Sequence, residues 1–137
     1  MKVKGLDNRE YTLSLIGKES KSISNRSKYH ILAREVIKRI YPSLKLAEEV
    51  HIPGLKTPMY LDFFMPLMKI AVEVQGEQHY KFNSFFHANK MEFFQAKGRD
   101  RMKKSWCELN DISLVELPYN ETEEQWEERL RNVFRTT

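Results

Sequence analysis

The sequence predicts an α/β protein in which helices pack on the faces of a mixed β-sheet (an α+β mixed sheet). Three observations support this class. The 137 residues, 41% hydrophobic and 12% aromatic, suffice for one domain with its own core. Apolar residues follow helical spacing in one N-terminal segment, and three strand-like segments separated by proline-containing turns come after it. The resulting order of the main body, α-β-β-β-α-β-α, is typical of a sheet covered by helices.

The N-terminal part of the chain, residues 1–26, contains one strand-like segment (9–16) and then a polar, Ser-rich linker. The main domain, residues 27–137, begins with a helix for which Ser27 is a suitable N-cap. Pro42 ends this helix, because proline cannot continue the hydrogen-bond pattern. The apolar positions with helical spacing are Ile31, Leu32, Val36, Ile37 and Ile40.

Three strands, a helix, a strand and a last helix follow. Pro53-Gly54 separates the first two strands, and the tight connection at Pro66 predicts a hairpin between the second and third. Asn110-Asp111 ends the second helix, and Asn120 can cap the last one. The expected bounds are 46–52, 58–65 and 68–75 for the strands, 84–109 for the second helix, 112–117 for the fourth strand and 121–134 for the last helix.

Charge and cysteine content limit the functional classes. The net charge is +4 and the pI is near 9.1, with 12 basic and 6 acidic side chains in residues 1–60, which is compatible with binding nucleic acid. The single cysteine, Cys107, excludes an internal disulfide and a multi-cysteine zinc site, and we expect it to be a buried helix residue. No apolar run has the roughly 18–20 residues that span a bilayer. These features predict a cytoplasmic protein without a membrane partner.

Two acidic residues interrupt the apolar strands of the predicted hairpin. Asp62 lies early in one strand and Glu73 late in the next, so the hairpin brings them side by side. Buried carboxylates are costly unless a partner compensates them, and hard oxygen ligands suit Mg²⁺ or Mn²⁺. The main-chain carbonyl of Val74 could add a ligand, and such an ion can activate water at a phosphodiester. The alternative is a pair of exposed acids on an ordinary hairpin.

The order α-β-β-β-α-β, with Asp62 followed by Glu73-Val74-Gln75, resembles the PD-(D/E)XK nuclease superfamily over about residues 27–117. Within it, Glu-Val-Gln-Gly-Glu-Gln-His-Tyr (73–80) is similar to the Vsr-like and the phage and homing-type endonucleases. The resemblance implies a restriction-endonuclease-like core, a Mg²⁺-dependent DNA endonuclease and a phage or mobile-element origin. The protein would then lie in the cytoplasm, nucleoid-associated or in the cytoplasm of a host.

The chain departs from the superfamily pattern at the position of the usual catalytic lysine, which is Gln75. A glutamine can orient a water molecule but carries no charge. In the Vsr-like relatives a histidine at about the place of His79 works in the active site, so His79 could act as a general acid or base. The alternative is that His79 is a structural turn residue.

A second departure lies in the first helix. Relatives often have a glutamate near the start of this helix, where this chain has His30, and the next acid is Glu35. Either residue could face the site. Glu35 could equally be a solvent-facing residue that pairs with Arg39 one turn along the helix.

Basic residues of the second helix are expected to contact DNA phosphates, as in the relatives. Lys103 lies one turn after Asp100 and could replace the missing catalytic lysine. The alternative for this segment is a solvated, charged helix face, and the aromatic segment 82–90 could stack on bases or pack in the core. The expected nucleic-acid contacts are Lys81, Arg99, Arg101, Lys103 and Lys104.

The sequence therefore predicts a small endonuclease in which Asp62 and Glu73 bind Mg²⁺ or Mn²⁺, Gln75 orients the attacking water and His79 assists proton transfer. One alternative is a non-catalytic DNA-binding module or subunit of the same fold, which the glutamine at 75 favours. Another is a nuclease that acts on RNA. A chain of this size has little surface for reading a long site, so a homodimer or a protein partner would be needed for double-strand cleavage.

Overall fold

The computed structural model describes residues 1–15, 28–76 and 90–136. Its centre is a four-stranded sheet in the order β3-β4-β5-β6, in which β5 pairs antiparallel with β4 and parallel with β6. This architecture confirms the predicted α/β mixed-sheet class, including the hairpin of β4 and β5. The bounds are Ala47–Ile52 for β3, Met59–Met65 for β4, Ile70–Gln75 for β5, Ser113–Pro118 for β6, Lys28–Ile40 for α1, Lys90–Leu109 for α2 and Glu123–Thr136 for α3.

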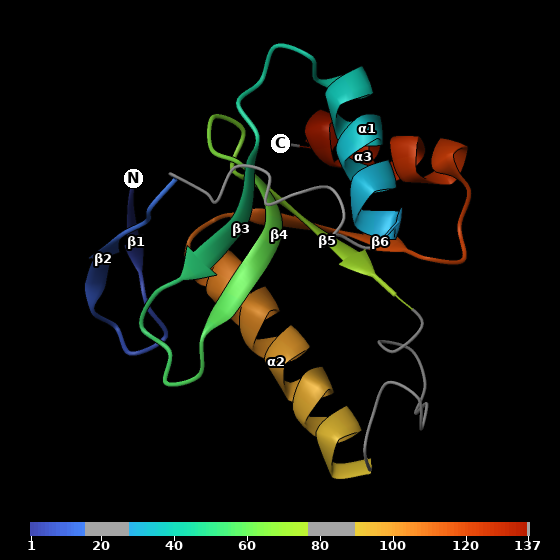
Figure 1. Ribbon diagram of the computed structural model, residues 1–137. Helices are drawn as coiled ribbons and strands as arrows, with labels where there is room; N and C mark the ends of the chain where they lie inside the picture. Colours follow the sequence, from blue (N-terminus) through green and yellow to red (C-terminus); the bar gives the residue numbers. More distant parts are fainter. Residues whose placement is uncertain (16–27, 77–89, 137) are drawn as a thin grey trace.

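Helices cover both faces of the sheet, so the molecule has two cores. Helices α1 and α3 lie on one face, and α2 lies on the other together with a two-stranded hairpin of β1 (Lys2–Lys4) and β2 (Glu10–Thr12) (Figure 1). Phe63 and Val72 belong to the core under α1 and α3, whereas Leu61 and Phe64 belong to the core under α2. None of the described helices has the length and apolar character needed to cross a membrane.

The N-terminal hairpin shares the core of the main domain. Val3 and Leu13 are buried against the residues of β3, β4 and α2. Asn110 fixes β1 to the end of α2, because its side chain accepts a hydrogen bond from Lys4 N (2.7 Å) and donates one to Lys4 O (2.9 Å). The sequence predicted one strand here, within 9–16. The partner strand β1 has only three residues, too few to show an alternating pattern.

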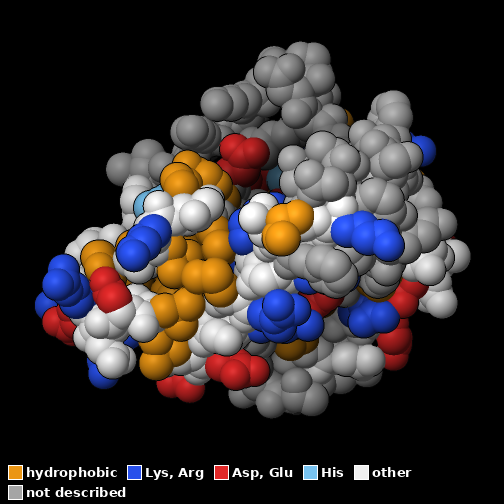
Figure 2. Space-filling view, turned by 90° about the horizontal axis from the view of Figure 1, so that it is seen from below, with side chains coloured by type: hydrophobic (Ala, Val, Ile, Leu, Met, Phe, Trp, Pro, Cys, Tyr) orange, Lys and Arg blue, Asp and Glu red, His pale blue; other side chains and the backbone are white. Residues whose placement is uncertain are grey.

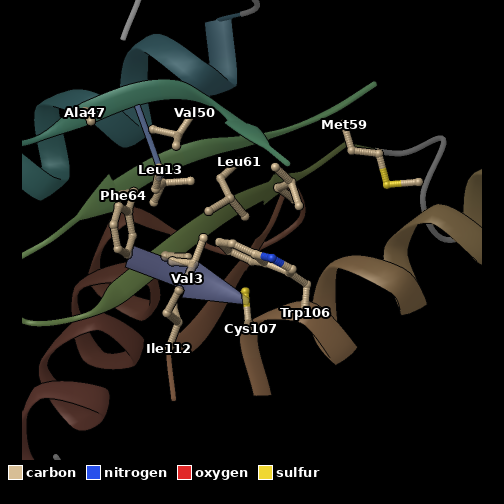
Figure 3. Packing of buried hydrophobic residues seen from close by; sticks show 12 residues of the cluster. Val3, Leu13, Ala47, Val50, Met59, Leu61, Phe64, Trp106, Cys107 and Ile112 are labelled. Carbon is tan, nitrogen blue, oxygen red and sulfur yellow. The ribbon is translucent and has the colours of Figure 1, made fainter. Parts of the chain in front are cut away.

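Two tryptophans anchor the helices to the sheet. Figure 3 shows the Trp106 ring of α2 lying beside Val3 and Leu61, and Trp106 is fully buried. Trp126 of α3 is buried in the opposite core, where its indole N–H donates to Pro118 O (2.8 Å). Cys107 is buried on α2 as predicted.

The cap of the last helix differs from the prediction. Thr122, not Asn120, caps α3: Gln125 N donates to Thr122 Oγ1 (3.2 Å), and Thr122 N donates to Gln125 Oε1 (2.8 Å). This reciprocal arrangement is a capping box, which satisfies two backbone donors of the first turn. Asn120 is an exposed turn residue before it. The expected cap Ser27 and the expected first turns of the second helix, including Phe85 and Phe86, lie outside the described residues.

Candidate active site

Asp62 and Glu73 meet where β4 and β5 stop pairing. The antiparallel ladder ends at the pair Phe63–Val72, and Asp62 and Glu73 would form the next pair. Instead, Asp62 N donates to Glu73 Oε2 (2.7 Å), and Val74 N donates to Asp62 Oδ2 (2.9 Å). Each carboxylate thus replaces a backbone acceptor of the opposite strand. The predicted hairpin brings the two acids together. Because the two strands stop pairing here, each carboxylate is held by a backbone N–H of the opposite strand.

A distortion of the neighbouring strand lies directly beside Asp62. The β3–β4 ladder contains the pairs Glu48–Phe63 and Val50–Leu61, and it omits the pair Glu49–Asp62 between them. Glu49 has a φ of 49°, in the left-handed region that disfavours residues with a Cβ. Along β4, the alternation of side chains between the two faces of the sheet shifts at the same place: Leu61 and Phe63, two positions apart, belong to opposite cores. Strained backbone of this kind is concentrated at functional sites.

Lys103 of α2 completes the cluster. Its Nζ lies 2.6 Å from Glu73 Oε1, and its side chain is 19% exposed. Burial alone would lower the pKa of Lys103, but Glu73, Asp62 and Asp100 raise it above its ordinary value, so the ammonium stays charged. A positive charge therefore lies beside the two carboxylates.

Glu73 is the group with the most perturbed proton affinity in this cluster. Burial, followed by the adjacent Asp62 carboxylate, raises its pKa from 4.5 to about 8, although Lys103 acts in the opposite direction. One ammonium does not compensate two neighbouring carboxylates in a buried place. A further cation at the carboxylates would favour the ionised form of Glu73.

The raised pKa predicts a stability loss at alkaline pH. The folded chain binds the Glu73 proton more tightly than the unfolded chain, so protonation of Glu73 stabilises the folded state. This contribution to the free energy of unfolding is complete below about pH 4.5 and is lost as the pH rises through about 8. In EDTA, between about pH 6 and about pH 8.5, we expect the wild type to lose about 2 kcal/mol more free energy of unfolding than Glu73→Gln. Urea unfolding at both pH values measures this difference. Equal losses in the two proteins would show that Glu73 is already ionised at the lower pH.

The donor atoms of this site fit a hard divalent cation. The two carboxylates supply oxygen ligands, and within the described part of the chain Asp62 Oδ1 accepts no hydrogen bond. The described residues contain no group of three or more His, Cys, Asp or Glu side chains able to hold a metal ion. Two carboxylates completed by water suit Mg²⁺, which takes oxygen ligands and keeps much of its hydration shell.

The remaining predicted site residues are distributed as follows. Gln75 is buried, two residues after Glu73 and therefore on the same side of β5. His79 and Lys81 lie outside the described residues. Glu35 is exposed on α1, and the structure does not bring it to the carboxylates; Arg39 pairs with Glu123 and Glu127 of α3 instead.

The basic residues of α2 have different surroundings. Lys103 points to Glu73, and Lys104 forms an ion pair with Glu116 of β6 (2.9 Å). Arg99 and Arg101 are exposed. The neighbouring Cys107 is no nucleophile in this setting, because burial and Glu73 raise the pKa of its thiol to about 12.

His30 takes part in a second buried cluster, between α1 and β3. Its Nε2 lies 2.9 Å from Glu48 Oε1, and its ring stacks on Phe63 at 4.4 Å between ring centres. Arg34 also binds Glu48, through Nε at 3.0 Å from Oε2 and a terminal nitrogen at 2.8 Å from Oε1. His30 is thus bonded to Glu48 rather than to Asp62 or Glu73. The cluster fixes α1 to Phe63, the residue next to Asp62.

Glu48 is the centre of this second cluster. Burial would raise its pKa, but the hydrogen bonds and charges of Arg34 and His30 lower it below the ordinary value. We expect Glu48→Ala to lower the free energy of unfolding by about 2–4 kcal/mol, because Arg34 and His30 lose their acceptor in a largely buried place. Urea unfolding beside Glu35→Ala, an exposed acid of α1 whose removal should cost less than about 0.5 kcal/mol, measures the effect. Similar values for the two variants would contradict it.

Comparison with known proteins found similar viral proteins of unassigned function. The chain is 42% identical over 59 residues to uncharacterized protein 307L of Invertebrate iridescent virus 6 and, to the same extent, to uncharacterized protein 033L of Invertebrate iridescent virus 3. It is 32% identical over 81 residues to uncharacterized protein 094L of Frog virus 3 (isolate Goorha). These matches cover 43% and 55% of this chain, and 30% and 52% of the relatives. No family model and no solved structure matches the chain.

Proposed function

We propose that this chain is a metal-dependent DNA endonuclease that hydrolyses phosphodiester bonds with Mg²⁺ or Mn²⁺. The observation that carries the proposal is the cluster of Asp62, Glu73 and Lys103, contributed by β4, β5 and α2. Lys103 Nζ lies 2.6 Å from Glu73 Oε1, and Asp62 and Glu73 each accept a backbone N–H of the opposite strand. Two carboxylates and an ammonium are groups that a metal-assisted phosphodiester site can use. The resemblance of residues 27–117 to PD-(D/E)XK nucleases supports the same function.

In this proposal, Asp62 and Glu73 hold the cation, and the Val74 carbonyl is a further candidate ligand. A bound Mg²⁺ or Mn²⁺ supplies Lewis-acid stabilisation of charge on the phosphate and lowers the pKa of a bound water. Lys103 provides the positive charge that the superfamily places at the position of Gln75. Gln75 orients the attacking water, and the product carries a 5′-phosphate by analogy with the superfamily. His79 stays a candidate for proton transfer.

The raised pKa of Glu73 supports a cation at this place. Burial and Asp62 make ionisation of Glu73 unfavourable, which a divalent ion would reverse. The ion would also displace part of the interaction with Lys103, whose Nζ could then turn to the phosphate. Lysine suits this movement, because its ammonium is a point charge on a flexible stem.

A non-catalytic DNA-binding module is the competing function. Gln75 in place of lysine favours it, because a neutral amide does not stabilise charge developing on the phosphate. Lys103 beside Glu73 favours the enzyme, since a cation then reaches the site from another element. DNA is the proposed substrate because the chain has a net charge of +4 and resembles DNA endonucleases. A homodimer or a protein partner would be required for double-strand cleavage.

The proposal is tested by incubating the chain with single-stranded, duplex and branched DNA and with RNA of the same sequence, each in Mg²⁺, Mn²⁺ and EDTA. We expect cleavage of DNA with either metal, none in EDTA, and 5′-phosphate ends. Binding without cleavage in any metal would favour the recognition module. Cleavage of RNA alone would show that the substrate is RNA, and the proposed active site would be unchanged.

A further inference from the structure

An open cavity lies beside the proposed active site, on the face of the sheet that α2 covers. Its volume is about 740 Å³, within the range of small-molecule sites. The β1–β2 turn, the loop between β3 and β4, and α2 form its walls. The residues that line it include Leu55, Lys56, Thr57, Met59, Gln95, Gly98, Arg99 and Met102.

The cavity is adjacent to the carboxylates along two elements. Arg99 lines it one helical turn before Lys103, a distance of about 6 Å along the helix axis. Met59 lines it three residues before Asp62, a distance of about 10 Å along the strand. A group bound in the cavity would therefore lie close to a phosphate bound at Asp62 and Glu73.

The chemistry of the walls fits a nucleobase with its phosphate. Leu55, Met59 and Met102 provide apolar and polarisable surface for a flat ring, while Thr57 and Gln95 offer polar groups for its edge. Lys56 and Arg99 are exposed at the rim and form no ion pair with another described residue. Asp7 is the one acid among the described lining residues, and it already accepts hydrogen bonds from Tyr11 and Arg9. Figure 2 shows this face, with an apolar area bordered by Lys and Arg side chains.

Gly98 is an independent sign that the cavity is kept open. It stands inside α2, where glycine weakens a helix relative to alanine. Among the described residues, a Cβ built at this position would meet nothing closer than an Arg101 side-chain atom at 3.8 Å, so their packing does not demand glycine. The absence of a side chain at Gly98 leaves space at the wall of the cavity.

We propose that the cavity between α2, the β3–β4 loop and the β1–β2 turn receives one unpaired nucleobase of the substrate, next to the phosphate that is cleaved. A base stacked in a duplex cannot enter a pocket without leaving the stack. The inferred substrate class is therefore DNA with an unpaired nucleotide near the cleavage site. This inference rests on the proposed nuclease function, because it places the base beside the proposed catalytic carboxylates.

The test measures affinity separately from cleavage. Fluorescence anisotropy in EDTA gives the dissociation constants of the full chain for a fully paired duplex and for the same duplex with one extra adenosine. Burial of one base against the apolar wall predicts about tenfold tighter binding of the bulged duplex by the wild type. Gly98→Leu and Thr57→Leu fill the cavity from opposite walls and should reduce this preference to below about twofold. Ser105→Leu, at an exposed position of α2 outside the described lining, should keep it.

Two results would overturn the inference. One is equal affinity of the wild type for the two duplexes, as expected if the cavity takes a side chain of a protein partner. The other is a preference that survives both Gly98→Leu and Thr57→Leu, since the unpaired base would then be bound elsewhere. Cleavage in Mg²⁺ is scored on the same DNA. If the wild type prefers the bulged duplex but does not cleave it, the proposed nuclease function fails and the nucleotide pocket stands. If it cleaves DNA without preferring the bulged duplex, only the inference of the pocket fails.

Discussion

Replacing either carboxylate of the site should abolish nicking of supercoiled plasmid. We expect Asp62→Asn and Glu73→Gln each to lower the rate in Mg²⁺ by about a thousandfold or more, because each removes a charged ligand whose cation stabilises the transition state by several kcal/mol. Both replacements are close in shape to the original residue. The amide introduced by Asp62→Asn would still offer an oxygen to Val74 N, so the strand arrangement should persist. Circular dichroism and thermal unfolding check that it does.

The matched control is Glu116→Gln. Glu116 lies directly opposite Glu73 in the parallel pair of β5 and β6, and its carboxylate binds Lys104 instead of the site. The same chemical change one strand away should alter the nicking rate by less than about twofold, as expected of a surface ion pair. Full activity in Asp62→Asn, or equal losses of nicking rate in Glu116→Gln and Glu73→Gln, would show that Asp62 and Glu73 do not form the active site.

Lys103 should carry the second largest effect. We expect Lys103→Met to lower the nicking rate by about a hundredfold or more, which is the cost of removing one preorganised donor at a developing negative charge. DNA affinity should change by less than about threefold, because one phosphate contact contributes modestly to binding. Single-turnover nicking and anisotropy on the same DNA separate the two quantities.

The neighbouring lysine provides the control, and β5 provides a rescue. Lys104→Met removes the same charge from the next position of α2, where the ammonium binds Glu116, and should keep the nicking rate within about twofold. Gln75 lies on the same side of β5 as Glu73, so Gln75→Lys in the Lys103→Met background should restore part of the rate. Equal rates for Lys103→Met and Lys104→Met would contradict a catalytic position for Lys103.

The parts of the structure that depend on local pattern could be predicted from the sequence. The turn at Pro66 and the apolar runs on both sides of it predicted the β4–β5 hairpin, and the hairpin then placed Asp62 opposite Glu73. Helix α1 followed from its apolar spacing and its proline stop. The limits of α3 were less accurate, because Asn120 with Glu123 and Thr122 with Gln125 have the same cap spacing, and only the fold selects Thr122.

Features that depend on contacts distant in sequence could not be derived in this way. Lys103 was one of several basic residues of α2, and only the packing of this helix on the sheet selects it as the partner of Glu73, 30 positions away. Nothing in the sequence indicated that Arg34 and Glu48 form an ion pair. The left-handed backbone at Glu49 was equally hidden, because glutamate gives no sign of a positive φ. His79 and Lys81 stay predictions, as they lie outside the described residues.

The central claim is that Asp62 and Glu73 form a metal-dependent phosphodiesterase site. Nicking of supercoiled plasmid by the wild type in Mg²⁺ and in EDTA, with Asp62→Asn measured beside it, tests this claim most directly. We predict nicking by the wild type in Mg²⁺ alone and none by Asp62→Asn in either condition. Nicking by the wild type in EDTA, or undiminished nicking by folded Asp62→Asn in Mg²⁺, would contradict the claim.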